Sequence, residues 1–179
     1  MQLMKWFSRI INRISLIGKW IHLYRIKKAK QVLVKIKEIY SDKKNGGKAI
    51  LYLRKINPYV FEELVLTAIE NSNIRVIRNE SYSNDGGIDG IFKLKKGKVI
   101  VQSKRYKGYI NNKHVEELSS IVRQEGYLFG VFAHTGRTGE KAKNTVKLEK
   151  NMIFISGDLL LKILVGDINI EQHINKKIS

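Results

Sequence analysis

The chain has 179 residues, 43% of them hydrophobic, no cysteine and a net charge of +18. This length holds one domain with a proper core plus an appendage. The lack of cysteine excludes disulfides and thiolate metal sites, so we expect a cytoplasmic protein in which oxygen or imidazole would hold any metal. The charge predicts a polyanionic partner, either nucleic acid or an anionic membrane. Residues 1–57 hold 15 Lys and Arg against Glu38 and Asp42, giving +13.

The first 40 residues predict one long or two shorter basic amphipathic helices. Between Leu3 and Ile39 apolar residues recur at helical spacing, and lysines and arginines interrupt them. No stretch approaches the roughly 20 apolar residues that span a bilayer, so we do not expect a transmembrane anchor. Trp6, Phe7 and Trp20 among the lysines keep contact between residues 1–40 and a membrane surface as an alternative.

Ser41 to Gly47 is rich in turn formers and free of apolar residues, so we place a boundary there. Residues 1–45 are predicted to be a basic helical extension and residues 46–179 a catalytic-sized domain. The predicted helices of that domain lie at 48–56, 59–71, 111–125, 138–148 and 157–165, and the strands at 74–78, 88–94, 98–104, 127–133 and 152–155. This order predicts an α/β domain with a mixed central sheet flanked by helices.

The predicted hairpin of residues 88–104 brings polar groups together. Alternate side chains of a strand share a face, so Gln102 and Lys104 point the same way. A lysine in an apolar strand is costly to bury unless a negative charge or a wet cleft lies beside it, and Asp89 can supply the charge. Asp89 could bind a metal or merely shape a turn, Gln102 could satisfy backbone groups, and Lys104 could extend to solvent.

The segment that holds Asp89, Gln102 and Lys104 resembles the Mrr-like branch of the PD-(D/E)xK nuclease superfamily, which is associated with type IV restriction. The resemblance covers about residues 57–165, and its marks are Phe61-Glu62, the segment DGGID at 85–89 and the segment VQSKRY at 101–106. The superfamily's proline is absent, since Gly87-Ile88 precedes Asp89. Glutamine at Gln102, where the superfamily has an acid, fits this branch.

The resemblance implies a restriction endonuclease-like fold and a Mg²⁺- or Mn²⁺-dependent endonuclease that hydrolyses DNA phosphodiester bonds, perhaps of foreign or modified DNA. Its catalytic residues would be Asp89, Gln102, Lys104 and Glu62. The metal ligands would be Asp89, Gln102, Glu62 and Asp85, although Asp85 could equally form an Asx turn. Because Glu62 and its neighbour on a helix point about 100° apart, we expect Glu63 to be solvated.

Basic and polar residues next to these motifs are predicted to hold DNA: Arg105, Tyr106, Lys107, Arg137 and Thr138. The last two precede a predicted helix start, where backbone amides favour an anion. Cutting a duplex with one site per chain would need two copies, so a homodimer is expected. The alternatives are a nucleic-acid-binding or membrane-associated protein without cleavage, and a nuclease that resembles Holliday-junction resolvases. The histidines show no metal-ligand spacing.

Overall fold

The computed structural model describes the backbone of residues 2–79 and 87–178 and the side chains of residues 16–79, 87–145 and 147–177. The elements follow one another along the chain as α1 (Gln2–Tyr40), the short 3₁₀ helix η1 (Lys43–Asn45), α2 (Gly46–Leu53), α3 (Pro58–Glu70), β1 (Val76–Arg78), β2 (Gly90–Leu94), β3 (Gly97–Lys104), α4 (Asn112–Gln124), β4 (Phe129–His134), α5 (Glu140–Leu148), β5 (Met152–Ser156), α6 (Gly157–Val165) and α7 (Ile170–Ile178). The predicted α/β order is confirmed, and the predicted elements agree with the observed ones to within a few residues.

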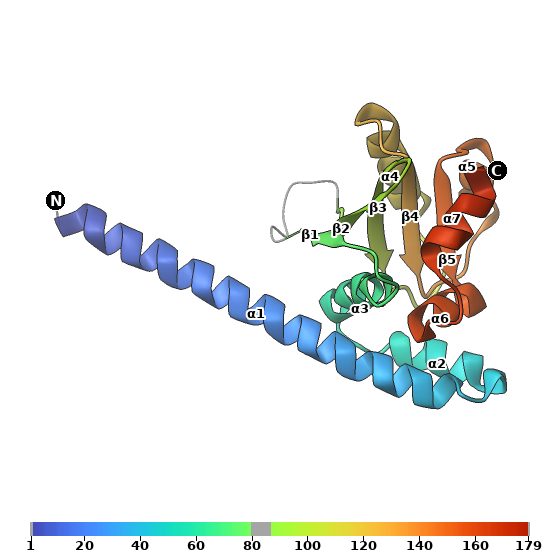
Figure 1. Cartoon of the computed structure of the whole chain (residues 1–179), viewed down its shortest axis with the longest axis horizontal. Coiled ribbons are helices and arrows are strands. Elements are labelled where there is room, and N and C mark those ends of the chain that lie inside the picture. The colour runs from blue at the N-terminus through green and yellow to red at the C-terminus, as the bar shows by residue number, and fades with distance from the viewer. Residues whose placement is uncertain (1, 80–86, 179) are drawn as a thin grey trace.

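The strands of the described residues form one mixed sheet of five strands in the order β1-β2-β3-β4-β5 (Figure 1). β1, β2 and β3 pair antiparallel, whereas β3, β4 and β5 pair parallel. The predicted hairpin is present, and its register places Gly90 opposite Val101 and Leu94 opposite Gly97. The start of β2 and the ends of β3, β4 and β5 therefore lie at the same end of the sheet.

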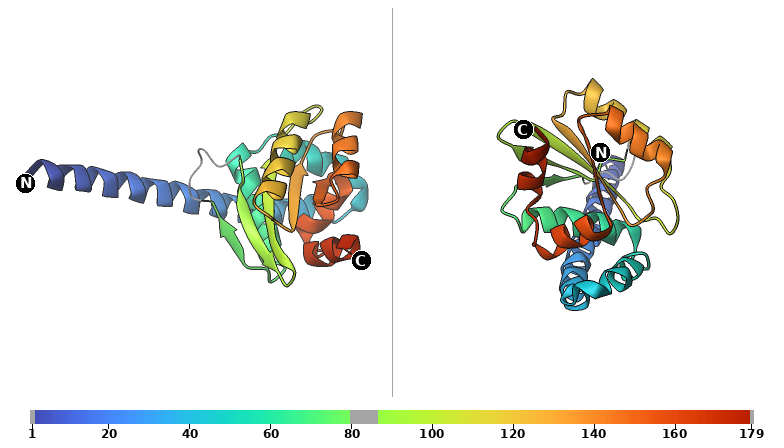
Figure 2. Two further views of the ribbon diagram at one scale, coloured as in Figure 1. Left: turned by 90° about the horizontal axis from the view of Figure 1, so that it is seen from above. Right: turned by 90° about the vertical axis from the view of Figure 1, so that its right-hand side faces the viewer.

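Helices cover both faces of the sheet, as the views in Figure 2 show. Buried side chains of α1, α2, α3, α6 and α7 pack with Val99 and Val101 on one face. On the other face, side chains of α4 and α5 pack with Ile100 and Phe132. Because side chains alternate along a strand, Gln102 and Lys104 follow Ile100 toward the α4 side. Both faces have their own apolar layer, which holds the sheet rigid between them.

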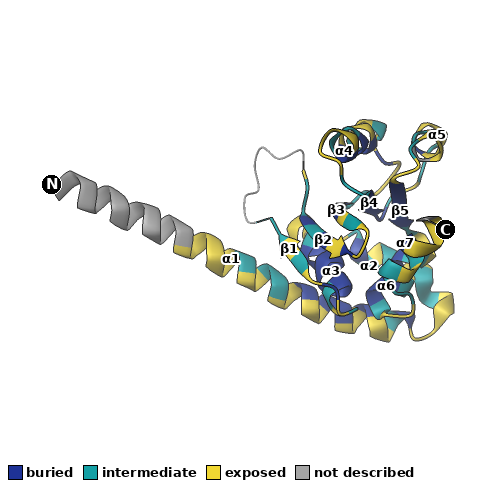
Figure 3. Cartoon of the chain, turned by 45° about the horizontal axis from the view of Figure 1, so that its top comes forward, coloured by how far each residue is buried: buried dark blue, intermediate teal, exposed yellow. Residues whose placement is uncertain are grey.

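The first helix is a single one that runs from Gln2 to Tyr40. Its second half belongs to the core, because Ala29, Ile36 and Tyr40 are at most 1% exposed and pack with α3 and α6. Its first half projects away from the domain (Figure 1), and residues 16–28 of the helix are mostly exposed (Figure 3). Within the described part of the chain, no helix is both long and apolar enough to cross a bilayer. The side chains of Trp6 and Phe7 lie outside the described residues.

The break predicted at residues 41–47 is present as a turn followed by η1. The side chain of Asp42 accepts a hydrogen bond from the backbone of Lys44 and begins this short helix. The proposed extension and domain nevertheless share one apolar core, since residues 29–40 pack beneath α3. Helix α7 was not predicted from the sequence; it packs on the core through Ile170 and Ile174.

Candidate active site

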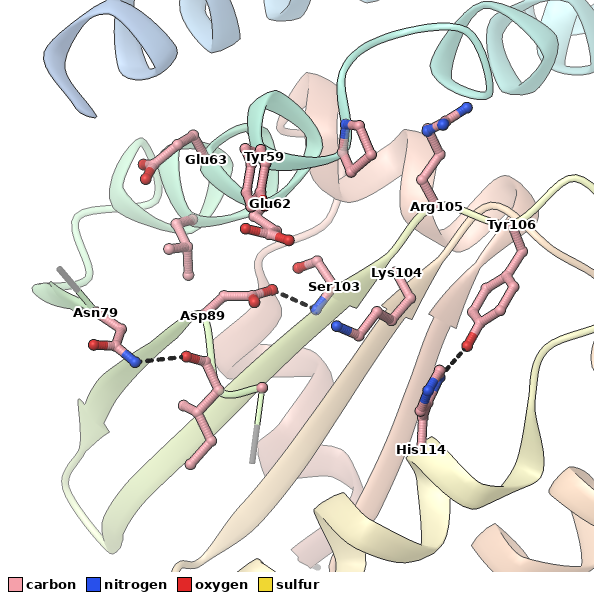
Figure 4. A pocket seen from close by; sticks show the side chains of 14 residues that line it. Tyr59, Glu62, Glu63, Asn79, Asp89, Ser103, Lys104, Arg105, Tyr106 and His114 are labelled. Carbon is pink, nitrogen blue, oxygen red and sulfur yellow. Dashed lines mark hydrogen bonds between the residues drawn. The ribbon is translucent and has the colours of Figure 1, made fainter. Parts of the chain in front are cut away.

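A cavity of about 440 Å³ opens where α3 approaches the end of the sheet at which β2 begins and β3 ends (Figure 4). Its position lets side chains from both layers of helices meet around the end of β3. The residues that line it are Pro58, Tyr59, Glu62, Glu63, Leu66, Asn79, Gly87, Ile88, Asp89, Ser103, Lys104, Arg105, Tyr106 and His114. Glu62, Asp89 and Lys104 are therefore brought together, although they are separated in the sequence.

Backbone and side-chain hydrogen bonds fix Asp89 on all sides. Its backbone N–H donates to the Val101 carbonyl at 2.8 Å, and its own carbonyl accepts from the Asn79 backbone at 3.0 Å. The Ser103 N–H donates to Asp89 Oδ2 at 2.5 Å. Burial, followed by the nearby charge of Glu62, raises the pKa of Asp89 well above its usual value, whereas the Ser103 hydrogen bond and Lys104 oppose this rise. Asp89 is thus a carboxyl group held in place by hydrogen bonds, and burial disfavours its ionised form.

Glu62 faces Asp89 from the first turns of α3, and in Figure 4 both carboxyl groups point toward the ammonium of Lys104. Burial raises the pKa of Glu62 to about 7; Lys104 and Arg25 counteract this shift, and Glu63 adds to it. The start of helix α3 is fixed by its capping residues: the Asn57 side chain accepts a hydrogen bond from the Tyr59 N–H at 2.9 Å, and Pro58 occupies the first helical position. This start places Glu62 in the first turns of the helix.

The prediction that Glu63 is solvated is wrong. Glu63 is 4% exposed, and its carboxylate lies 2.9 Å from Arg78 Nε and 3.2 Å from His22 Nδ1. Arg78 also binds Glu70, so the guanidinium ties α3 to β1. Both glutamates lie at the cavity, but Glu63 is held by partners on α1 and β1 while Glu62 faces Asp89 and Lys104. Glu63 therefore has a structural role, whereas Glu62 is available for chemistry.

Gln102 and Lys104 meet at Gly87, which has a left-handed backbone with φ of 76°. A Cβ atom added to Gly87 would lie 2.6 Å from Gln102 Nε2 and 3.6 Å from Lys104 Nζ. Both side chains therefore reach the same loop, as the alternation along β3 predicts. Gln102 is 2% exposed and lies beneath Gly87 rather than on the cavity wall, whereas Lys104 lines the cavity. A side chain at residue 87 would displace the amide.

The oxygen atoms at this site are of the chemical type that binds a hard divalent cation. Carboxylate and amide oxygens are the ligands that Mg²⁺ and Mn²⁺ prefer. Burial raises the pKa of both Asp89 and Glu62, and the charge of Glu62 raises the pKa of Asp89 further; a cation would relieve both conditions. Among the residues that the structure describes, no group of three or more His, Asp or Glu side chains is placed to hold a metal. Asp85, the further predicted ligand, lies outside the described residues.

The three residues that directly follow β3, Arg105, Tyr106 and Lys107, differ in what their side chains contact. The Arg105 guanidinium donates to the backbone carbonyl of Arg54 and points away from the carboxyl groups in Figure 4. The hydroxyl of Tyr106 shares a hydrogen bond with His114 Nδ1, and both residues line the cavity. Lys107 is exposed. Tyr106 is thus placed to touch a ligand in the cavity, while Arg105 joins β3 to the end of α2.

Arg137 and Thr138 lie beyond the cavity lining. They precede α5, whose cap is Gly139, so their predicted position before a helix start is confirmed. The backbone of Arg137 donates to the Gly108 carbonyl at 2.9 Å and accepts from the Ile110 N–H at 3.0 Å. This pairing supports the loop that carries Tyr106. The Arg137 side chain is exposed at a separate cavity beside α2 and α6.

Sequence reasoning missed three residues near the site: Tyr59, Arg25 and His114. Tyr59 and His114 line the cavity, and the Arg25 guanidinium lies 4.1 Å from the centre of the Tyr59 ring. A helical projection of α3 would have placed Tyr59 close to the face of Glu62, since the two residues are three positions apart in the sequence. Arg25 and His114 come from helices whose docking the local sequence does not reveal.

The mixed sheet of five strands, flanked by helices, gives the chain a restriction endonuclease-like fold, and an acid, an amide and a lysine lie at the end of its hairpin. Residues 53–164 match the family model Mrr_cat, described as a restriction endonuclease. The protein belongs to this restriction endonuclease family, and the resemblance inferred from the motif residues is confirmed. No protein with curated annotation matches the chain.

Three solved structures are similar to the chain. The MspJI restriction endonuclease in complex with a 27-mer oligonucleotide has 16% identity and a TM-score of 0.42, over 84% of this chain and 35% of that one. The DNA modification-dependent restriction endonuclease AspBHI has 15% identity and a TM-score of 0.47, over 85% of this chain and 40% of that one. SfsA of Pyrococcus furiosus in complex with Ca²⁺ has 17% identity and a TM-score of 0.35, over 54% of each chain. The chain thus spans less than half the length of the first two proteins.

Proposed function

We propose that this protein is a divalent-metal-dependent endodeoxyribonuclease that hydrolyses phosphodiester bonds of foreign or modified DNA. The observation that supports it most is the convergence of Glu62, Asp89 and Lys104 in one cavity of a restriction endonuclease domain. Mg²⁺ or Mn²⁺ would be held by Asp89, Glu62 and the amide oxygen of Gln102, with Asp85 as a further ligand. The bound cation neutralises phosphate charge and lowers the pKa of water.

The protein's own groups would orient the attacking water and stabilise the charge that builds on the phosphate. Asp89 is held by the Ser103 N–H, so it enters the reaction already oriented. The Lys104 ammonium lies beside the carboxyl groups, where it orients or deprotonates the attacking water and counters charge that builds on the phosphate. Gln102 would contribute a neutral ligand, so the site carries one negative charge fewer than a site with a carboxylate at this position. This composition suits a polyanionic substrate.

The DNA contacts that we propose outside the cavity centre come from Arg105, Tyr106, Lys107, Arg137 and Thr138. Arg105 and Tyr106 both line the cavity next to the end of β3, and Tyr106 is the better placed because the Arg105 guanidinium donates to the Arg54 carbonyl. We further propose that two copies act together on a duplex, since one cavity of this kind serves one strand. Sedimentation of the protein alone and with duplex DNA measures this assembly.

The decisive experiment incubates the purified protein with methylated, unmodified, single-stranded and branched DNA, with and without Mg²⁺. We expect Mg²⁺-dependent cuts, and the preferred substrate separates a restriction enzyme from a junction-resolving one. The Asp89→Ala and Lys104→Ala variants should lose cleavage while salt-sensitive DNA binding persists. Cleavage that survives in both variants removes this assignment of the site. Binding without cleavage of any substrate by the unaltered protein supports a non-catalytic binding protein instead.

A further inference from the structure

Helix α1 lies outside the residues that match the family model, yet it contacts the rim of the active-site cavity. The guanidinium of Arg25 lies 4.1 Å from the centre of the Tyr59 ring, and Tyr59 lines that cavity. One turn earlier, His22 lies 3.2 Å from Glu63. The cavity wall on the side of α3 is therefore completed by a helix that the family match does not include.

A groove of about 530 Å³ continues from this contact along α1. It is lined by Ile21, Tyr24, Arg25, Lys28, Val32, Ile56, Asn57 and Val60. Its α1 residues recur at spacings of three and four, as on one helical face. Lys28 Nζ lies 5.9 Å from the centre of the Tyr24 ring, and Tyr24 is 59% exposed. The groove thus presents two cations, each beside an aromatic ring, and its described lining contains no acidic side chain.

We propose that this groove binds a nucleotide of the cleaved DNA strand next to the phosphate held in the cavity. Its phosphate lies between Arg25 and Lys28, and its base or sugar packs against Tyr24. Aromatic rings with interleaved cations are the means by which proteins hold a nucleic acid strand without reading its sequence. The inference rests on the proposed nuclease function and gives the basic first helix a defined part in it.

The shape and position of the groove favour a nucleic acid over a membrane or a second copy of the chain. A bilayer would contact protruding apolar side chains, and the two most exposed of these among the described residues of α1, Trp20 at 75% and Leu23 at 63%, lie outside the groove lining. The groove is concave and lies next to the cavity, because Arg25 of the groove lining lies against Tyr59 of the cavity lining, so a strand leaving the cavity on this side would reach it. Its charge has the opposite sign to that of a phosphate chain.

The test compares Lys28→Ala with Lys27→Ala. Lys27 is exposed and adjacent in sequence but absent from the groove lining, so both variants lose one positive charge of the same helix. DNA affinity is measured over a series of salt concentrations in EDTA, where cleavage does not interfere. We expect Lys28→Ala to reduce the slope of log K against log salt by roughly 1 and Lys27→Ala to leave it unchanged. Equal slopes for the two variants would overturn the proposal.

Tyr24→Ala tests the ring contact separately, with Trp20→Ala as the aromatic control on the same helix. We expect Tyr24→Ala to weaken DNA binding on the order of tenfold with an unchanged salt slope, because stacking is not ionic. Trp20→Ala should leave DNA binding intact. A loss of binding in the control but not in Tyr24→Ala contradicts the groove assignment.

These measurements remain informative if the protein does not cut DNA, because they record binding alone. Failure of the nuclease function shows as absent cleavage with the Lys28 effect retained, whereas failure of the groove shows as normal cleavage with the effect absent. Flotation with anionic vesicles and sedimentation without DNA complete the test. Vesicle binding or dimer formation that Lys28→Ala abolishes, together with an unchanged DNA salt slope, would assign the groove to a membrane or to a second copy and overturn the proposal.

Discussion

The two ends of the central sheet differ in the way they treat polar side chains. At the end where β3 finishes, Gln102, Ser103, His134 and Thr135 are at most 2% exposed, and Lys104 is partly buried beside carboxyl groups. At the other end, Lys95 and Lys96 in the turn between β2 and β3, and Lys93 and Lys98 in the adjoining strands, are all exposed. Both ends are polar, but one end buries its polar groups whereas the other leaves them in solvent.

This difference shows that surroundings rather than charge make a site. An exposed lysine keeps its hydration and adds little beyond net charge, whereas a lysine held among buried carboxyl groups changes their protonation. The chain needs both kinds, because exposed lysines attract a polyanion from a distance and enclosed ones act on it at contact. Variants at the two ends can separate the two roles.

The largest expected effect is at Asp89. Asp89→Asn keeps the shape of the side chain but removes the anionic oxygen, so we expect metal-dependent cleavage to fall on the order of a thousandfold or more. Isothermal titration with Mn²⁺ should show correspondingly weaker metal binding. Circular dichroism serves as the control for folding. Unchanged Mn²⁺ affinity would contradict the ligand role.

Lys104 and Lys96 give the direct comparison of the two ends. Lys104→Met retains the apolar stem of the lysine, and we expect cleavage to fall about a hundredfold or more because the charge beside the phosphate is lost. Lys96→Met removes the same charge at the exposed turn and should leave single-turnover rates unchanged. Similar losses in both variants would mean that net charge, and not the site, determines the rate.

Glu62 and Glu63 separate chemistry from stability within α3. Removing Glu63 leaves Arg78 partly buried without this partner, so Glu63→Ala should lower the free energy of unfolding by about 3 kcal/mol. Glu62→Ala relieves burial of an acid whose pKa is raised, so its stability should be equal or higher while cleavage falls. Urea denaturation and cleavage assays on both variants measure the contrast. The reverse pattern would exchange the two roles.

His134 provides the pH dependence at the buried end. Burial lowers the pKa of His134 from 6.5 to about 4, so the unfolded chain binds this proton more readily than the folded one. Stability is therefore retained above pH 6.5 and falls as the pH drops toward 4, by about 2 to 3 kcal/mol. In His134→Gln the acid slope measured by urea denaturation should be shallower. Identical slopes in both proteins would exclude this histidine as the cause.

Much of the fold could be predicted because each element carries its own periodicity. The strand Lys98 to Lys104 and the helix after Pro58 bury residues at the spacing that the sequence shows, and the glycine at Gly97 marks the turn. The shared face of Gln102 and Lys104 follows from alternation alone. These are local rules, and they held at the centre of the candidate site.

Contacts between distant segments could not be predicted in the same way. The burial of Glu63 depends on Arg78 and His22, which lie on other elements. The hydrogen bond from the Arg105 guanidinium to the carbonyl of Arg54 likewise joins two segments that are distant in the sequence. Helix α7 has two buried isoleucines among mostly polar residues, too few to reveal the helix before its docking surface is known.

The continuity of α1 has a consequence for how the protein can vary. The helix is anchored in the core by residues such as Ile36 and runs without interruption to Gln2, about 35 Å along the axis from Arg25 at a rise of about 1.5 Å per residue. The direction of its outer part is therefore fixed relative to the candidate active-site cavity. One inserted residue between the two parts would rotate everything beyond it by about 100°, whereas seven would nearly restore the original direction. Length changes in this segment are thus tolerated in steps, not one residue at a time.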